Sequence, residues 1–87
     1  MYRIYYTKKA AGDIAKLKSV KLDQKAKDLI EILRENPYQT PPSYEKLKGD
    51  LQGAYSRRLN HKHRLVYQVF ENEKIVKIIR MWTHYDL

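Results

Sequence analysis

Hydrophobic and polar residues alternate at the start of the chain and then recur at helical spacing. The segment YRIYY at residues 2–6 alternates in the way that is typical of a β-strand. Thr7 stands where it can cap a first helix that runs to about Lys18, and a second helix ends where Asn36 precedes Pro37. The apolar residues that recur along the two helices predict their buried faces; they are Ala10, Ile14, Leu17, Leu22, Ala26, Leu29, Ile30 and Leu33.

Residues 37–53 show no clear period. The segment contains three prolines and two glycines, so we expect a loop. A loop of this length is unusual in a small domain, and long loops are often functional. We expect Leu47 and Leu51 to attach it to the core.

Three strand-like runs complete the pattern. They are AYSRRL, HRLVYQVF and KIVKIIRMW, with a turn at residues 71–73 between the last two. Because HRLVYQVF is apolar on both faces, we expect it to lie centrally in a sheet. The predicted order is β-α-α-β-β-β, a sheet with two helices on one face. A chain of 87 residues has the length of one domain, so we assign residues 1–87 to a single domain.

Positive charge is concentrated in two segments. The chain has 18 Lys and Arg against 10 Asp and Glu, a net charge of 18 − 10 = +8. Residues 1–20 contribute 5 − 1 = +4 and residues 54–70 contribute 4 − 0 = +4, while the other segments are balanced. A segregated excess favours an anionic partner, with nucleic acid first and an acidic protein second. A merely solvated basic surface would give the same charge count.

Several classes of protein do not fit this sequence. There is no cysteine, which excludes a disulfide framework and a thiolate metal site. His61 and His63 form an H-x-H pair without a clear third ligand, so we expect no metal and no other cofactor. No run is apolar enough to span a membrane, and the N-terminus lacks the apolar core of a signal peptide. We therefore expect a cytoplasmic protein that does not associate with membranes.

Arginines fall on the predicted sheet in a regular way. Alternation places Ser56 and Arg58 on one face of their strand and Arg57 on the other. In the next strand Arg64 is opposite to Leu65, which we place against the helices. Arg58 can therefore join Arg64 on the open face, where two guanidiniums would suit a phosphate. Alternatively, each arginine is satisfied by backbone carbonyls or by a carboxylate.

The run YEKLKGDLQGAYSRRLNHKHRLVYQV, followed by His84-Tyr85 near the end, resembles the Txe/YoeB family of bacterial toxins. This family belongs to the RelE-like superfamily, so the resemblance implies an α+β domain with two helices on one side of a mostly antiparallel sheet. It also implies the toxin of a type II toxin–antitoxin system, which cleaves mRNA in the A site of the 70S ribosome. The implied partner is an antitoxin of the YefM/Phd type with an acidic segment. Whether the toxin is a monomer or a homodimer stays open.

The resemblance assigns roles to individual residues. Glu45 falls on the general base of the family, His84 on the proposed general acid, and Tyr85 on the tyrosine beside it. RNA carries its own nucleophile, the 2′-OH, so cleavage needs a base, an acid and positive donors around the phosphate. The basic residues predicted for the phosphate are Arg64, which we count as catalytic, together with Lys48, Arg57 and Arg58.

Three functions remain compatible with the sequence. The first is the mRNA endoribonuclease, and the second is a toxin on the same fold that inhibits a protein such as DNA gyrase, as ParE toxins do. The third is a basic RNA-binding module without catalysis. The fold alone does not separate them. Glu45 and His84 favour the nuclease, because a gyrase inhibitor needs no acid–base pair.

Overall fold

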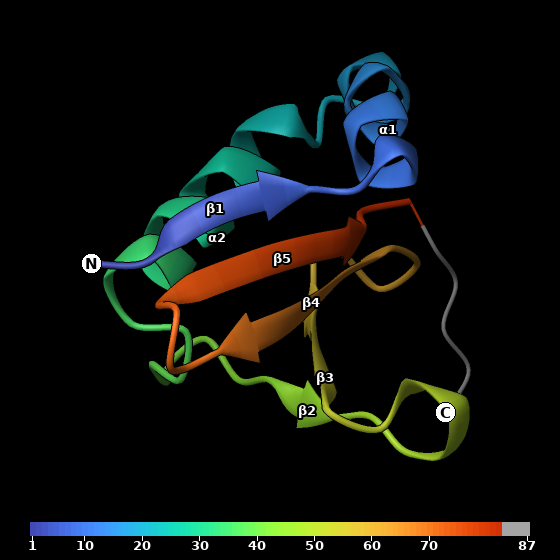
Figure 1. Ribbon diagram of the computed structural model, residues 1–87. Helices are drawn as coiled ribbons and strands as arrows, with labels where there is room; N and C mark the ends of the chain where they lie inside the picture. Colours follow the sequence, from blue (N-terminus) through green and yellow to red (C-terminus); the bar gives the residue numbers. More distant parts are fainter. Residues whose placement is uncertain (83–87) are drawn as a thin grey trace.

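Both helices pack against the same side of one sheet in the computed structural model, which describes residues 1–82 (Figure 1). This arrangement confirms the prediction from the sequence pattern. Within the described residues, no helix is long and apolar enough to cross a membrane. The elements in chain order are β1 (Arg3–Tyr6), α1 (Lys8–Ser19), α2 (Asp23–Glu35), β2 (Glu45–Lys46), the 3₁₀ turn η1 (Gly49–Leu51), β3 (Ala54–Arg58), β4 (Arg64–Phe70) and β5 (Ile75–Arg80).

β4 lies at the centre of a five-stranded sheet whose order is β1-β5-β4-β3-β2. β1 pairs with β5 in parallel, and every other neighbouring pair is antiparallel. Leu65, Val66 and Tyr67 of β4 are all buried, although they alternate between the two faces. This confirms that the HRLVYQVF strand is central and covered on both sides.

The main core lies between the helices and the sheet. α2 ends at Glu35 with Asn36 as its C-cap, as the sequence predicts. α2 packs its apolar stripe against inward-facing residues of β4 and β5, which removes a large apolar area from water. The buried residues from these three elements are Ala26, Leu29, Ile30, Leu33, Leu65, Tyr67, Val76 and Ile78.

α1 begins as expected and buries Ala10 and Leu17 as predicted, but one predicted core residue is exposed. The hydroxyl of Thr7 accepts a hydrogen bond from the Ala10 backbone N–H at 3.0 Å and so caps the helix. Ile14, which we expected in the core, is 40% exposed, whereas Asp13 is only 2% exposed. The cause is tertiary, because Asp13 faces the end of β5 and satisfies polar groups there.

Residues 37–53 contain a short strand and a 3₁₀ turn that the sequence pattern did not reveal. β2 has two residues, which is too few to show a period of two. Leu47 is buried against Ala54 and Val66, and Leu51 and Ile79 pack around them. The prediction that Leu47 and Leu51 attach this segment is confirmed. They do so in a second, smaller apolar cluster, separate from the main core.

The turn between β4 and β5 is joined to two other segments through the carboxylate of Glu71. The hydroxyls of Tyr2 and Tyr38 donate to its Oε1 at 2.7 and 2.8 Å, and Lys74 Nζ lies 3.2 Å from its Oε2. These hydrogen bonds hold the pKa of the Glu71 carboxyl below its usual value. Burial, helped by the hydrogen bond to Glu71, raises the pKa of Tyr38. The ionised carboxylate thus connects the N-terminus, the segment after α2 and the β4–β5 turn.

The Glu71 contacts predict a pH dependence of stability. Because the carboxyl pKa is lower in the folded than in the unfolded chain, ionised Glu71 stabilises the fold above the unfolded pKa. This contribution is lost as the pH falls through the folded pKa. We expect Glu71→Gln to lower the melting temperature slightly at pH 7 and to flatten its decline as the pH falls below about 5. Thermal unfolding followed by circular dichroism measures this.

The matched control is Glu73→Gln, which changes an exposed glutamate of the same turn. It should follow the wild-type profile. An unchanged profile for Glu71→Gln would show that the ionised carboxylate does not contribute to stability.

Candidate active site

The strand register brings four polar residues to the sheet face away from the helices. Glu45 of β2 pairs with Ser56 of β3, and Arg58 of β3 pairs with Arg64 of β4. Directly opposed residues in an antiparallel pair point to the same face. Since Ser56 and Arg58 are two residues apart in β3, all four side chains share this face. The prediction that Arg58 and Arg64 lie together on the open face is confirmed.

Arg64 links the two pairs. Its Nη1 donates to Glu45 Oε1 at 3.1 Å and to the hydroxyl of Ser56, also at 3.1 Å. The Arg64 side chain is 13% exposed, while the Glu45 side chain is 48% exposed. Glu45 contacts a single nitrogen of the guanidinium and the pair is not bidentate, so a phosphate oxygen can compete for Arg64. The buried Ser56 hydroxyl keeps Arg64 oriented during such an exchange.

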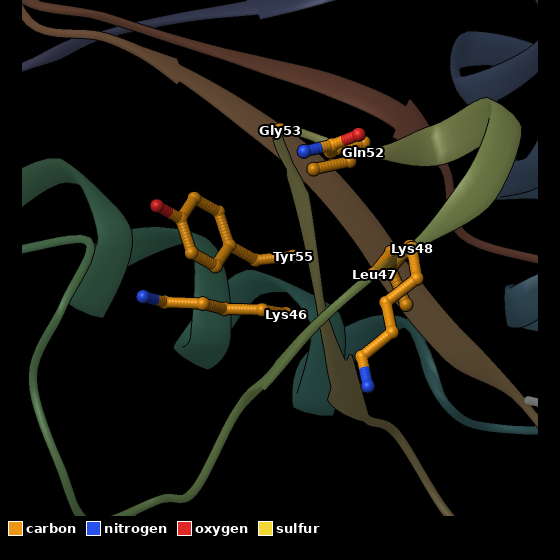
Figure 2. Close-up of a pocket in the computed structure, with 7 residues that line it drawn as sticks. Lys46, Leu47, Lys48, Gln52, Gly53 and Tyr55 are labelled. Carbon is orange, nitrogen blue, oxygen red and sulfur yellow. The ribbon is translucent and has the colours of Figure 1, made fainter.

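Lys48 lies on the same segment as Glu45, between β2 and η1, and is exposed. It lines a shallow hollow of about 640 Å³ at the outer edge of the sheet. Figure 2 shows the Lys46 side chain running beside its cross-strand partner Tyr55, while Lys48 extends away from both. Both lysines add positive charge to this edge of the sheet, but Lys46, opposed to Tyr55, lies on the face opposite to Glu45.

The structure contradicts the prediction that Arg57 binds phosphate. The residue is 1% exposed and lies on the side of β3 that faces the helices. Its Nε donates to the hydroxyl of Tyr67 at 3.1 Å. Its terminal nitrogens donate to the carbonyls of Pro37, Gln39 and Pro42 at 3.0, 2.9 and 2.6 Å. A guanidinium enclosed in this way is not accessible to RNA.

The histidines occupy different environments. His61 is exposed in the β3–β4 connection, whereas His63 is buried and stacks on the ring of Trp82, with 4.1 Å between the ring centroids. His84 and Tyr85, the predicted acid and its neighbour, lie outside the described residues. Within residues 1–82, no group of three or more His, Cys, Asp or Glu side chains is arranged to hold a metal ion.

Asp13 is a functional candidate that the sequence pattern did not single out. Its Oδ2 accepts hydrogen bonds from Arg80 Nε at 3.1 Å and from the backbone N–H groups of Met81 and Trp82 at 2.9 and 3.1 Å. Arg80 in turn donates to the Trp82 carbonyl at 3.0 Å. Asp13 therefore fastens the end of β5, together with Met81 and Trp82, against α1. One feature of the sequence did indicate this position: the spacing of Asp13 places it on the same face of the helix as Ala10 and Leu17, which are buried.

Residues 6–85 match the family of YoeB-like toxins of bacterial type II toxin–antitoxin systems. The chain belongs to this YoeB family. It is 34% identical to Toxin YoeB of Streptomyces coelicolor over 65 residues, 75% of each chain. Its structure is similar to that of a YoeB/ParE toxin from Agrobacterium tumefaciens, with a TM-score of 0.86 and 28% identity over 95% of this chain and 99% of that one. It is also similar to a chain of the YoeB–YefM complex from Staphylococcus aureus, with a TM-score of 0.79 and 34% identity. That match covers 98% of this chain and 99% of the other.

Membership of the YoeB family confirms the resemblance found in the sequence. The chain is the toxin component of a type II toxin–antitoxin system. The solved relatives align over nearly its whole length, so the expected RelE-like α+β fold is confirmed as well. The YoeB fold here places Glu45, Arg58 and Arg64 on one surface and Arg57 inside.

Asp13→Ala tests the attachment of Met81 and Trp82 to α1. It leaves the N–H groups of Met81 and Trp82 and the Arg80 guanidinium without their acceptor. We expect the free energy of unfolding to fall by about 1–3 kcal/mol. Urea unfolding followed by tryptophan fluorescence measures the change, since Trp82 is the single tryptophan. Asp28→Ala on the exposed surface of α2 is the control and should change stability little; an equal loss in both variants would contradict a special role for Asp13.

Proposed function

We propose that this toxin is an endoribonuclease that cleaves mRNA in the A site of the 70S ribosome. The observation that carries the proposal is the contact between Glu45 and Arg64 on the open face of the sheet, with Arg58 beside it. A partly exposed carboxylate next to guanidinium groups combines a proton acceptor with ligands for phosphate. YoeB family membership supports the same function.

RNA provides the nucleophile for the proposed reaction. Glu45 accepts the proton of a 2′-OH, and the resulting oxygen attacks the adjacent phosphorus. The bond from phosphorus to the 5′-oxygen of the next nucleotide breaks, and His84 protonates that oxygen. The products are a 2′,3′-cyclic phosphate and a 5′-OH end. Every role belongs to a side chain, so the proposed reaction uses no metal ion or other cofactor.

Binding of the phosphate would also prepare the base. In the free toxin Arg64 holds Glu45 at 3.1 Å. A phosphate oxygen that takes over the guanidinium releases the carboxylate toward the 2′-OH. Arg58 and Lys48 add positive charge as negative charge develops on the phosphoryl oxygens. Tyr85 would act beside His84, and because the substrate is mRNA on translating ribosomes, the toxin would act in the cytoplasm.

We further propose that the toxin is neutralised by an acidic segment of a YefM/Phd-type antitoxin. The relative from Staphylococcus aureus was solved as a YoeB–YefM complex. This chain has two basic regions. The first is α1, whose exposed positive charge comes from lysines. The second consists of Arg58, Lys62 and Arg64, since Arg57 is buried. An acidic chain crossing these two regions would cover the Glu45–Arg64 pair. The α1 lysines are Lys8, Lys9, Lys16 and Lys18.

Brief expression in bacteria followed by mapping of mRNA 5′ ends tests the nuclease function. We expect wild-type toxin to produce new 5′-OH ends within translated codons. Glu45→Ala and Arg64→Ala should reduce cleavage on the order of 10²–10⁴-fold, because each removes a base or a phosphate ligand. His61→Ala is the matched control, because His61 is exposed and has no role in the proposed reaction.

Two other outcomes would contradict the nuclease function and support a different one. Intact mRNA with arrested DNA replication would support a protein target such as DNA gyrase. Stable RNA binding without new 5′-OH ends would support a non-catalytic RNA-binding module.

A chain that ends at Trp82 separates folding from catalysis. Trp82 already stacks on His63 and donates its backbone N–H to Asp13, so the described contacts stay intact. We expect this chain to fold and to bind antitoxin but not to arrest growth, and His84→Ala should reproduce most of that loss. Far-UV circular dichroism, antitoxin pull-down and growth after induction measure the three properties. A folded, fully toxic Trp82-terminated chain would show that His84 and Tyr85 are not catalytic.

A further inference from the structure

Arg57 makes its hydrogen bonds to the loop that leads into Glu45. This loop, residues 37–44, connects α2 to β2, and Glu45 is the first residue of β2. We propose that Arg57 is a positioning residue for RNA cleavage: it holds the loop so that Glu45 meets Arg64 and the substrate. The inference rests on the proposed nuclease function. It goes beyond that function because it gives a role in cleavage to a buried residue that does not itself touch RNA.

The loop depends on Arg57 for part of its own hydrogen bonding. Pro37, Pro41 and Pro42 have no backbone N–H and cannot donate within the loop. Arg57 donates to the carbonyls of Pro37, Gln39 and Pro42 at 3.0, 2.9 and 2.6 Å. One planar group therefore fixes the start, the middle and a late position of the loop relative to β3.

Tyr44 extends this attachment to the residue before Glu45. The Arg57 Cζ lies 5.0 Å from the centroid of the Tyr44 ring, a distance typical of a cation–π contact. The Tyr55 ring meets Tyr44 edge-on, with the centroids 5.5 Å apart and an angle of 83° between the planes. Because the Tyr44 ring is held on two sides, the backbone that enters Glu45 has little freedom.

β2 on its own is a weak anchor for Glu45. It has two residues and pairs only with β3, because it lies at the edge of the sheet. After Glu45 the chain is held by Leu47, which is buried against Ala54 and Val66. Before Glu45 it is held by Arg57 and Tyr44. Loss of Arg57 would thus release one side of Glu45 while Leu47 keeps the other in place.

The chemistry of the site requires arginine. Three carbonyls and a hydroxyl accept from the three nitrogens of Arg57, and a guanidinium can donate to all of them at once. Tyr67 fixes the plane, because it accepts from Arg57 Nε at 3.1 Å and donates to the Pro37 carbonyl at 3.0 Å. Burial raises the pKa of Tyr67, so its hydroxyl stays protonated and able to donate at neutral pH. A lysine would keep the charge but would lose the fork geometry.

A merely structural arginine and a positioning arginine make different kinetic predictions. If Arg57 only stabilises the fold, folded variants should retain kcat. If it positions Glu45, kcat should fall while KM for the ribosome complex stays nearly constant, because Arg57 lies on the sheet side opposite to Glu45. Loss of a phosphate ligand such as Arg58 should instead raise KM and change its salt dependence, whether or not kcat also falls.

The experiment measures single-turnover and steady-state cleavage of a defined mRNA on purified 70S ribosomes, with purified toxin. We expect Arg57→Lys and Arg57→Ala to lower kcat by about 10–100-fold with KM changed by no more than about twofold. Leu17→Ala is the control for stability, because Leu17 is equally buried but lies on α1. It should destabilise the fold and keep kcat.

Two further readouts report on Glu45 directly. If Arg57 acts through Glu45, adding Glu45→Ala to Arg57→Ala should cause a much smaller loss than Glu45→Ala causes in the wild type. Millimolar guanidinium should also restore part of the kcat of Arg57→Ala, where it can occupy the vacated space. It should not restore Glu45→Ala.

The outcomes separate the inference from the function on which it rests. If the wild type does not cleave mRNA, the nuclease function and this inference both fail. If the wild type cleaves but folded Arg57 variants keep kcat, or if the losses from Arg57→Ala and Glu45→Ala multiply, only the inference fails. A raised KM in Arg57→Ala would indicate that Arg57 takes part in binding RNA. That result would also contradict the inference.

Discussion

Antiparallel pairing of β3 with β4 is the constraint on which both the core and the candidate active site depend. Its register sets Arg57 opposite Leu65 on the helix side and Arg58 opposite Arg64 on the other side. Because side chains alternate strictly along a strand, a slip of one residue would expose Arg57 and bury Arg58. The same register sets Ser56 where it can accept a hydrogen bond from Arg64. Pairing of β3 with β4 therefore places both arginines and Ser56 of the candidate site.

Two buried charged groups secure the segments that the hydrophobic core cannot hold. Arg57 satisfies carbonyls of the loop before β2, and Asp13 satisfies N–H groups after β5. Each charge is stabilised by backbone dipoles, and Asp13 also by Arg80. Buried charges need such hydrogen bonds, because their desolvation is otherwise unfavourable. Arg57 acts on the segment that precedes Glu45, and Asp13 acts on Met81 and Trp82.

The sheet face away from the helices is divided between packing and chemistry. Leu47 packs on Ala54 and Val66, so this part of the face is closed by apolar side chains. The arginine end of β3 and β4 remains accessible, and Glu45 stands between the two regions. The segment that contains β2 and η1 separates the apolar part of this face from the polar part. It is held in place because Leu47 and Leu51 pack in the apolar cluster. The site is thus built on rigid strands, with one short segment adding the carboxylate.

The sequence by itself determined the order of the main elements, the Thr7 cap, the end of α2 and the shared face of Arg58 and Arg64. Each of these depends on residues that are close along the chain, and the YoeB resemblance added the expected roles. Only the tertiary structure decided the buried positions of Arg57 and Asp13 and the existence of β2. Their partners are distant in sequence: Arg57 reaches a carbonyl 20 residues away, and Asp13 reaches N–H groups 68 and 69 residues away. Local sequence patterns do not reveal such contacts. A charged residue that makes hydrogen bonds to buried backbone groups therefore looks the same in the sequence as one that faces water.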